Sequence, residues 1–268
     1  MHSMQMVDIP PGQTVIGTSQ ENIQSLLDTS TWAADWVHKG YFSREQPQHV
    51  VIIEPFKISK YPVMVGEFRE FIHQKGYTTQ QYWTRSGWDW VNANQIRKPA
   101  FWDEKIWTSQ DRLPVVGVSW YEAAAFCRWL SDVEQKTFSL PTEFQWERAA
   151  RGNDDRIHPW GNKFDAQRCN TRSGGKGKTT LVGSYSPGGD SRFGCCDMIG
   201  NVSEWTRSLF LPYPYREEEG NSLEGSMERV SRGGSWHSPD FRSRVNSRGM
   251  NDPFFRDNDL GFRVVCLD

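Results

Sequence analysis

The stretch from Gly152 to Glu228 constrains the fold more than any other part of this 268-residue sequence. It is dominated by Gly, Pro, Asn, Ser and aromatic residues, with turn signals such as Pro187-Gly188-Gly189-Asp190. Loops of this length inside a compact domain are unusual, and they are either functional or held by something such as a bound ion. We therefore expect an α+β protein with low regular secondary structure, a few helices, short antiparallel sheets and a decorated loop surface.

The aromatic content indicates that these loops are ordered. The chain contains 13 Trp, 15 Phe and 8 Tyr, far more aromatic surface than a disordered segment carries. Its 31 Lys and Arg nearly balance 33 Asp and Glu, for a net charge of −2, so nothing predicts nucleic acid or an anionic membrane as a partner. No apolar run is long enough to span a membrane, and the first residues lack the pattern of a signal peptide. We expect a cytoplasmic protein.

Helix signals are few. Apolar residues at 65, 68, 71 and 72 form one buried stripe that ends at Gly76, and capping boxes begin helices after Ser119 and Thr142, the second closed by Gly152. Everything else is predicted as strands and loops. The strand candidates are Met6–Ile9, Val50–Ile58, Arg229–Arg232 and Gly261–Val265.

No linker divides the chain, so we predict one domain over residues 1–268. Residues 19–41 read as an insertion, whose Trp32 and Trp36 pack on the core or form a partner surface; core packing is the simpler explanation. The five cysteines are scattered and odd in number, which is typical of reduced thiols. The adjacent pair Cys195-Cys196 leaves a redox or metal role open.

Several segments, in this order, resemble the formylglycine-generating-enzyme, or sulfatase-modifying-factor, domain family. They are Met6–Gly12, Pro114–Trp120, Leu140–Glu147, Pro159–Asn162, Cys169–Thr171, Asp197–Trp205, Arg232–Trp236 and Gly261–Arg263. The resemblance spans almost the whole chain. It implies a single domain with that family's C-type-lectin-like fold.

The resemblance does not carry over the family's oxidase chemistry. Those enzymes bind copper through two cysteines soon after the Arg-Gly-Gly-Ser segment, but here Ser238 stands at the first position and the second falls near Asp240. A hydroxyl is a poor Cu(I) ligand, so copper is not expected and no catalytic residue is assigned. Iron is not expected either: the family's iron-dependent sulfoxide synthases use histidines of an added helical domain. A facial triad assembled from distant loops stays open.

Calcium is the cofactor that the sequence predicts. Asp197 and Glu204, with the carbonyls of Gly200 and Val202, offer the hard oxygen ligands that Ca²⁺ prefers, and the resemblance places a structural calcium there. The alternative is that Glu204 pairs with an arginine and Asp197 caps a turn. A second family site would use Asn170 and Thr171. Its acidic ligand falls near Gly174 in this sequence, and nearby lysines could replace the ion.

Residues 237–260 are the predicted ligand-binding surface, because aromatic and short polar groups are mixed there without periodicity. The candidates are His237, Ser238, Asp240, Phe241, Arg242, Ser247, Gly249, Met250, Asn251, Asp252, Phe254, Phe255, Asp257, Asn258 and Asp259. The layout resembles variable proteins diversified by retroelements, which end in Arg-Gly-Gly-Ser-Trp, a variable stretch and Gly-Phe-Arg-Val-Val. The alternative is an ordinary loop. We interpret its Arg244, Arg248 and Arg256 as structural.

Three functions follow from these features. The first is a non-catalytic domain that binds a protein or small-molecule ligand at residues 237–260. The second is an oxidoreductase that uses another metal or none, with His237 and Asp240 as ligands or acid–base groups. The third is a regulatory module fused to an effector domain or encoded beside an effector protein.

Overall fold

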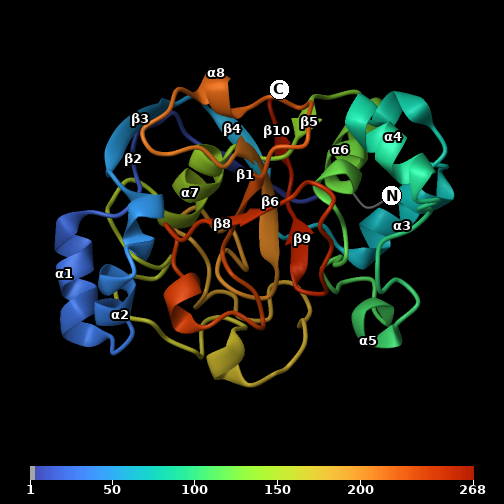
Figure 1. Ribbon diagram of the computed structural model, residues 1–268. Helices are drawn as coiled ribbons and strands as arrows, with labels where there is room; N and C mark the ends of the chain where they lie inside the picture. The colour runs from blue at the N-terminus through green and yellow to red at the C-terminus, as the bar shows by residue number, and fades with distance from the viewer. Residues whose placement is uncertain (1–3) are drawn as a thin grey trace.

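The computed structural model describes residues 4–268 and contains three small sheets, of which the first and third lie at the centre of the molecule and the second lies toward its edge (Figure 1). The first contains, in order, β1 (Met6–Ile9), β4 (Phe56–Ser59), β10 (Val265–Cys266) and β5 (Phe138–Ser139). The second pairs β2 (Gly12–Ile16) with β3 (His49–Ile53). The third contains β8 (Gly249–Asn251), β7 (Arg229–Arg232), β6 (Ser203–Leu209) and β9 (Leu260–Phe262). All pairs are antiparallel except the parallel pair β6–β9.

The three predicted helices form where their caps place them. These are α3 (Val65–His73), α6 (Trp120–Glu134) and α7 (Glu143–Arg151). The Ser119 hydroxyl accepts the Glu122 N–H at 3.1 Å, while the Glu122 carboxylate accepts the Ser119 N–H at 2.8 Å. Gly152, with a φ of 80°, ends α7 in a conformation that favours glycine.

The expectation that the rest of the chain lacks helices is wrong. The structure adds α1 (Gln20–Thr29), α2 (Ala33–His38), α4 (Arg85–Ala93), α5 (Lys105–Thr108) and α8 (Glu217–Gly220), and 3₁₀ turns at Tyr41–Glu45, Gln80–Tyr82, Arg172–Gly174 and Asp240–Arg242. The two longer helices begin at single side-chain caps: Ser19 accepts the Asn22 N–H, and Thr84 accepts the Gly87 N–H. Neither cap is a full capping box, so the sequence gives only a weak signal for the start of either helix.

Two predicted strands are each divided. Val50–Ile58 becomes β3 and β4 because Pro55, which has no N–H to donate to a ladder, lies between them. Gly261–Val265 becomes β9, which pairs with β6, and β10, which pairs with β4 in another sheet. The strands β2, β5, β6 and β8 were not predicted.

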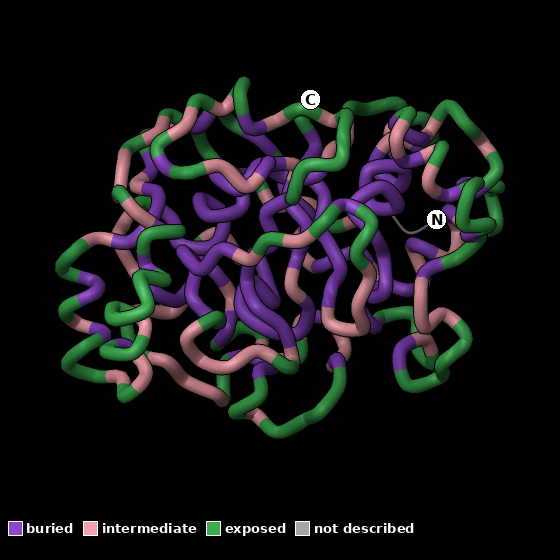
Figure 2. The backbone as a smooth tube through the Cα atoms, viewed as in Figure 1, coloured by how far each residue is buried: buried purple, intermediate pink, exposed green. Residues whose placement is uncertain are grey.

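Two large hydrophobic clusters lie in the interior, where the chain is mostly buried (Figure 2). One lies between α3 and α6 and is rich in aromatic contacts; the rings of Phe68 and Phe126 stack with centroids 5.5 Å apart. The other surrounds α7 and includes Trp146. The cysteines Cys127, Cys169, Cys195, Cys196 and Cys266 are all buried and free.

The insertion forms a small cluster of its own on one flank, at the opposite end of the view from α3 and α4 (Figure 1). Ile23, Leu26, Ala33 and Phe42 pack there with Ile157, and the rings of Trp32 and Trp36 lie against them. In the described part of the chain, no helix is long and apolar enough to cross a membrane.

Candidate functional site

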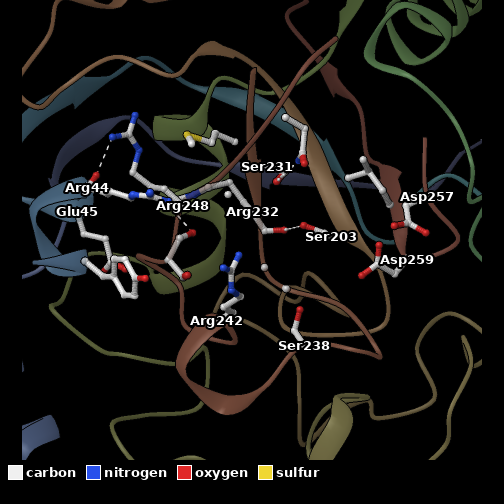
Figure 3. Close-up of a pocket in the computed structure, with 18 of the residues that line it drawn as sticks. Arg44, Glu45, Ser203, Ser231, Arg232, Ser238, Arg242, Arg248, Asp257 and Asp259 are labelled. Carbon is white, nitrogen blue, oxygen red and sulfur yellow. Dashed lines mark hydrogen bonds between the residues drawn. The ribbon is translucent and has the colours of Figure 1, made fainter. Parts of the chain in front are cut away.

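A cavity of about 360 Å³ lies between the insertion and the third sheet (Figure 3). Its lining has three sources. The insertion and the turn after it supply Trp36, Tyr41, Arg44 and Glu45; β6, β7 and β8 supply Ser203, Ser231, Arg232, Gly249, Met250 and Asn251; and the loops of the C-terminal region supply Gly233, Gly234, Ser238, Arg242, Ser247, Arg248, Phe255, Asp257 and Asp259, with Leu260 of β9. Segments far apart in sequence therefore build one site.

Nine of the fifteen residues predicted to bind a ligand line this cavity. They are Ser238, Arg242, Ser247, Gly249, Met250, Asn251, Phe255, Asp257 and Asp259. Sequence reasoning missed Arg44, Ser203 and Ser231, which lie outside the predicted surface. Only the aromatic residues of the insertion gave a signal, and they did not indicate that this segment faces residues 237–260.

The other six predicted residues do not line the cavity. Phe241 packs on the insertion, with its ring 5.1 Å from that of Trp36. His237 and Asp240 contact the 172–174 turn: His237 Nε2 lies 3.3 Å from an Arg172 guanidinium nitrogen, and the Ser173 hydroxyl donates to Asp240 at 2.6 Å. The Asn258 carbonyl accepts the Trp236 indole N–H, and Asp252 and Phe254 are exposed.

Buried ion pairs surround the cavity. Arg248 donates to both oxygens of Glu143, at 2.9 and 2.8 Å, and Arg232 pairs with Glu147. Burial raises the pKa of Glu143, but the charges of Arg248 and Arg232 outweigh it and hold that pKa below its ordinary value. These guanidiniums are therefore already neutralised.

The third buried pair joins the turn after the insertion to the C-terminal region. Arg244 donates to the two oxygens of Glu45 at 2.8 and 2.7 Å, and its guanidinium also lies over the rings of Trp32, Trp36 and Phe42. Arg256 lies 3.8 Å from Glu122. The interpretation of Arg244, Arg248 and Arg256 as structural residues is confirmed.

Four charged groups of the cavity have no such partner. Within residues 4–268, Arg44 and Arg242 have no carboxylate within 4.0 Å, and Asp257 and Asp259 have no basic group within 4.0 Å. The Asp259 carboxylate accepts the Ser235 hydroxyl at 2.6 Å, and burial raises its pKa. In Figure 3 the two aspartates lie together at one end, Arg44 lies at the other, and Arg242 lies between them.

Comparison with known proteins identifies the family. Residues 2–267 match the model of the sulfatase-modifying factor enzyme 1-like domain. The chain belongs to this family. It is 32% identical over 261 residues to the inactive C-alpha-formylglycine-generating enzyme 2 of Mus musculus, covering 82% of this chain and 78% of that protein.

The chain is also similar to a second curated protein and to a solved structure. The chain is 32% identical over 242 residues to hercynine oxygenase of Mycobacterium tuberculosis, covering 82% of this chain but only 55% of that enzyme. The solved structure of Treponema denticola variable protein 1 superposes with a TM-score of 0.71 at 21% identity, covering 99% of this chain and 95% of that one. This second likeness shows the shared fold and confirms the predicted fold class.

The position of the family's first copper cysteine is occupied by a structural hydroxyl. Ser238 Oγ accepts the Ser235 N–H at 2.9 Å. The chain's own cysteines lie elsewhere, and burial raises the pKa of the Cys169 thiol to about 12 and that of Cys195 to about 11, which disfavours thiolates. Among residues 4–268, no three His, Cys, Asp or Glu side chains are grouped as a metal site.

The predicted calcium segment is not one loop, because Glu204 belongs to β6. Arg263 donates to both oxygens of Glu204, at 2.6 and 2.8 Å, and the Trp146 indole donates at 2.7 Å. Asp197 accepts the Gly183 N–H at 2.6 Å, and burial raises its pKa to about 6. The contacts named as the alternative to calcium are thus present, so Glu204 has little capacity left for an ion.

The Asn170 segment fits a cation better. It lies beside Gly200, whose N-terminal neighbours include Asp197, and the Asn201 N–H donates to the Asn170 carbonyl at 2.7 Å. Asn170 Oδ1 and Thr171 Oγ1 are buried and have no hydrogen-bond partner. Orphaned buried oxygens are the donors that a calcium ion takes up. Calcium stays a prediction, and the oxygen donors available to it are those of Asn170 and Thr171.

Proposed function

We propose that the chain is a non-catalytic member of the family that binds a small-molecule ligand in the cavity between the insertion and the C-terminal region. The observation that carries the proposal is the cavity itself, about 360 Å³, built largely from the predicted binding surface. Its volume is in the range of small-ligand sites. The serine at position 238, in place of a metal-binding thiol, and the inactive relative of Mus musculus support binding without turnover.

A thermal-shift screen of a small-molecule library tests this proposal. Met250 lines the cavity and is 37% exposed, so Met250→Trp narrows the cavity without disturbing the core; Met227, 56% exposed and outside the cavity, gives the matched control Met227→Trp. We expect compounds that raise the melting temperature of the wild type and of Met227→Trp but not of Met250→Trp. If no compound distinguishes the two variants, the proposal is wrong.

The second candidate is a metal-dependent oxidoreductase, favoured by the 32% identity to hercynine oxygenase. The chain spans about half of that enzyme, and the candidate ligands His237 and Asp240 point into contacts with the 172–174 turn. Oxygen consumption in the presence of a thiol, after loading with iron or copper, tests this candidate. Turnover that is lost in His237→Ala would replace the first proposal with this one.

We also propose that a calcium ion stabilises the loops around Asn170, Thr171 and Asp197. The support is the pair of orphaned buried oxygens of Asn170 and Thr171, together with the pairing of Asn170 with Gly200, which follows the buried Asp197 in the chain. After dialysis against EDTA, added Ca²⁺ should raise the melting temperature of the wild type and raise that of Asn170→Ala much less. An equal response of both proteins, or none, would contradict a calcium ion at this position.

A further inference from the structure

The third sheet presents hydroxyl groups to the cavity from neighbouring strands. Ser203 of β6 and Ser231 of β7 line the cavity, together with Asn251 of β8 (Figure 3 labels the two serines). The Asn251 side chain donates an N–H to Ser231 Oγ at 3.2 Å, so this hydroxyl accepts one hydrogen bond and keeps its own hydrogen to donate. This wall of the cavity therefore offers groups that both donate and accept hydrogen bonds.

Gly249 keeps the Ser231 hydroxyl uncovered. The two residues are paired across β7 and β8, and both line the cavity. A Cβ at position 249 would lie 2.4 Å from Ser231 Oγ, closer than any ordinary contact. The backbone of Gly249 is outside the left-handed region, so its conformation does not require glycine. We attribute the glycine to access, because a side chain at this position would displace or cover the hydroxyl.

Two carboxylates beside this wall are held in fixed orientations. Asp259 Oδ2 accepts the Ser235 hydroxyl at 2.6 Å, and Asp257 Oδ1 accepts the Asn258 N–H at 2.7 Å. The Asp259 carbonyl accepts the Ser203 N–H at 2.8 Å, which places Asp259 next to the hydroxyl wall. An ionised carboxylate can accept about four hydrogen bonds, so both aspartates have capacity left for the donors of a ligand.

Hydroxyl groups are the ligand chemistry that matches this lining. A ligand hydroxyl can donate to an aspartate and accept from a serine, whereas an ammonium group only donates and a carboxylate only accepts. Phe255, two residues before Asp257, lines the same cavity with its ring. An aromatic ring packs well against the C–H groups of a molecule whose edges carry hydroxyls.

Resting on the proposed function, we propose that the cavity binds a neutral sugar, a pyranose of monosaccharide size. Neighbouring hydroxyls of the sugar donate to Asp257 and Asp259, another hydroxyl accepts from Ser231, and a C–H face of the ring packs on Phe255. These contacts are made directly by protein groups. A volume of about 360 Å³ accommodates one sugar ring.

Saturation-transfer NMR of the full chain with individual sugars tests the proposal. The panel contains D-glucose, D-galactose, D-mannose, D-xylose and N-acetyl-D-glucosamine. We expect at least one of them to bind with a Kd in the millimolar range or tighter, measured by titration. Deoxy derivatives of that sugar should bind at least about tenfold more weakly at one or more positions, because a missing hydroxyl leaves polar groups of the site unpaired. If every deoxy derivative binds as tightly as the parent sugar, the assignment is overturned.

Glycine variants locate the sugar. Gly249→Ala should weaken its binding at least about tenfold. Gly188→Ala is the matched control, because Gly188 is exposed, lies outside the cavity and would place its Cβ no closer than 3.8 Å to another residue; its binding should not change.

The double variant Gly249→Ala/Ser231→Ala separates a lost contact from a disturbed fold. It removes the steric conflict, so it should recover any melting temperature that Gly249→Ala loses, but it should not recover sugar binding. Recovered binding would show that Ser231 does not contact the sugar and would overturn the proposed site.

The library screen separates this inference from the proposed function. If library compounds bind in the cavity but no sugar of the panel does, the sugar assignment fails and the proposed function stands. If nothing binds, both fail.

Discussion

Two groups of charged residues line the same cavity but differ in their partners. Those next to α7 are paired with buried glutamates, whereas the others have no opposite charge close by. Around α7, Arg232 and Arg248 each bind a glutamate and are almost completely excluded from water. In the lining of the same cavity, Arg44 and Asp257 have no opposite charge within salt-bridge distance. The comparison teaches that the same residue types hold the fold together where they are paired and remain available to a ligand where they are not.

The largest effect should come from breaking a buried pair. Glu143→Gln leaves Arg248 buried without its counter-charge and should lower the free energy of unfolding by about 3–5 kcal/mol, measured by urea denaturation. Glu219→Gln, which breaks an exposed pair with Arg216, is the control and should leave the free energy of unfolding nearly unchanged. Similar losses in the two variants would remove the distinction on which the comparison depends.

The pair between Arg244 and Glu45 should give a smaller, local effect. Arg244→Gln leaves the Glu45 carboxylate buried and unpaired, so the insertion should open before the rest of the molecule. Hydrogen exchange followed by mass spectrometry should show faster exchange in α1 and α2, by about tenfold or more. Unchanged exchange there, or a uniform increase throughout the chain, would show that this pair does not anchor the insertion.

A buried carboxylate without a guanidinium should make stability depend on pH. Glu67 caps α3 by accepting the Met64 N–H at 2.8 Å, and burial raises its pKa from 4.5 to about 7. The native state then binds a proton more tightly than the unfolded state, so the free energy of unfolding should fall by about 3 kcal/mol as the pH rises from 4.5 to 7.5. In Glu67→Gln this part of the pH dependence should vanish; a dependence equal to that of the wild type would refute the assignment.

The smallest effect on stability should come from the cavity itself. Arg242→Gln removes an unpaired charge and should change the free energy of unfolding by less than about 0.5 kcal/mol in urea denaturation. A loss comparable to that of Glu143→Gln would mean that Arg242 also has a structural role.

Much of this organisation could be predicted from the sequence. The capping boxes predicted where α6 and α7 begin, and the family motifs, taken in their order along the chain, predicted the fold. The half of the cavity formed by residues 237–260 was predicted as well, because exposed aromatic and short polar groups are unusual over so long a stretch. The division of Val50–Ile58 at Pro55 could also have been predicted from the chemistry of proline.

The other half could not be predicted, because it depends on contacts between distant segments. Arg44 and Trp36 line the cavity on a segment that Arg244 holds by binding Glu45, a pair separated by 199 residues. Glu204 was assigned to calcium because a carboxylate in a glycine-containing segment resembles a metal ligand, but its strand places it against Arg263. Local sequence patterns do not say which of several arginines a buried glutamate will meet.

The most direct test of the division between paired and unpaired charges combines two measurements on one variant. Asp257→Asn should unfold in urea within about 0.5 kcal/mol of the wild type, yet lose most of the rise in melting temperature that cavity-binding compounds give the wild type. That result would assign Asp257 to the ligand and not to the fold. Loss of stability, or binding that is unchanged, would contradict the account.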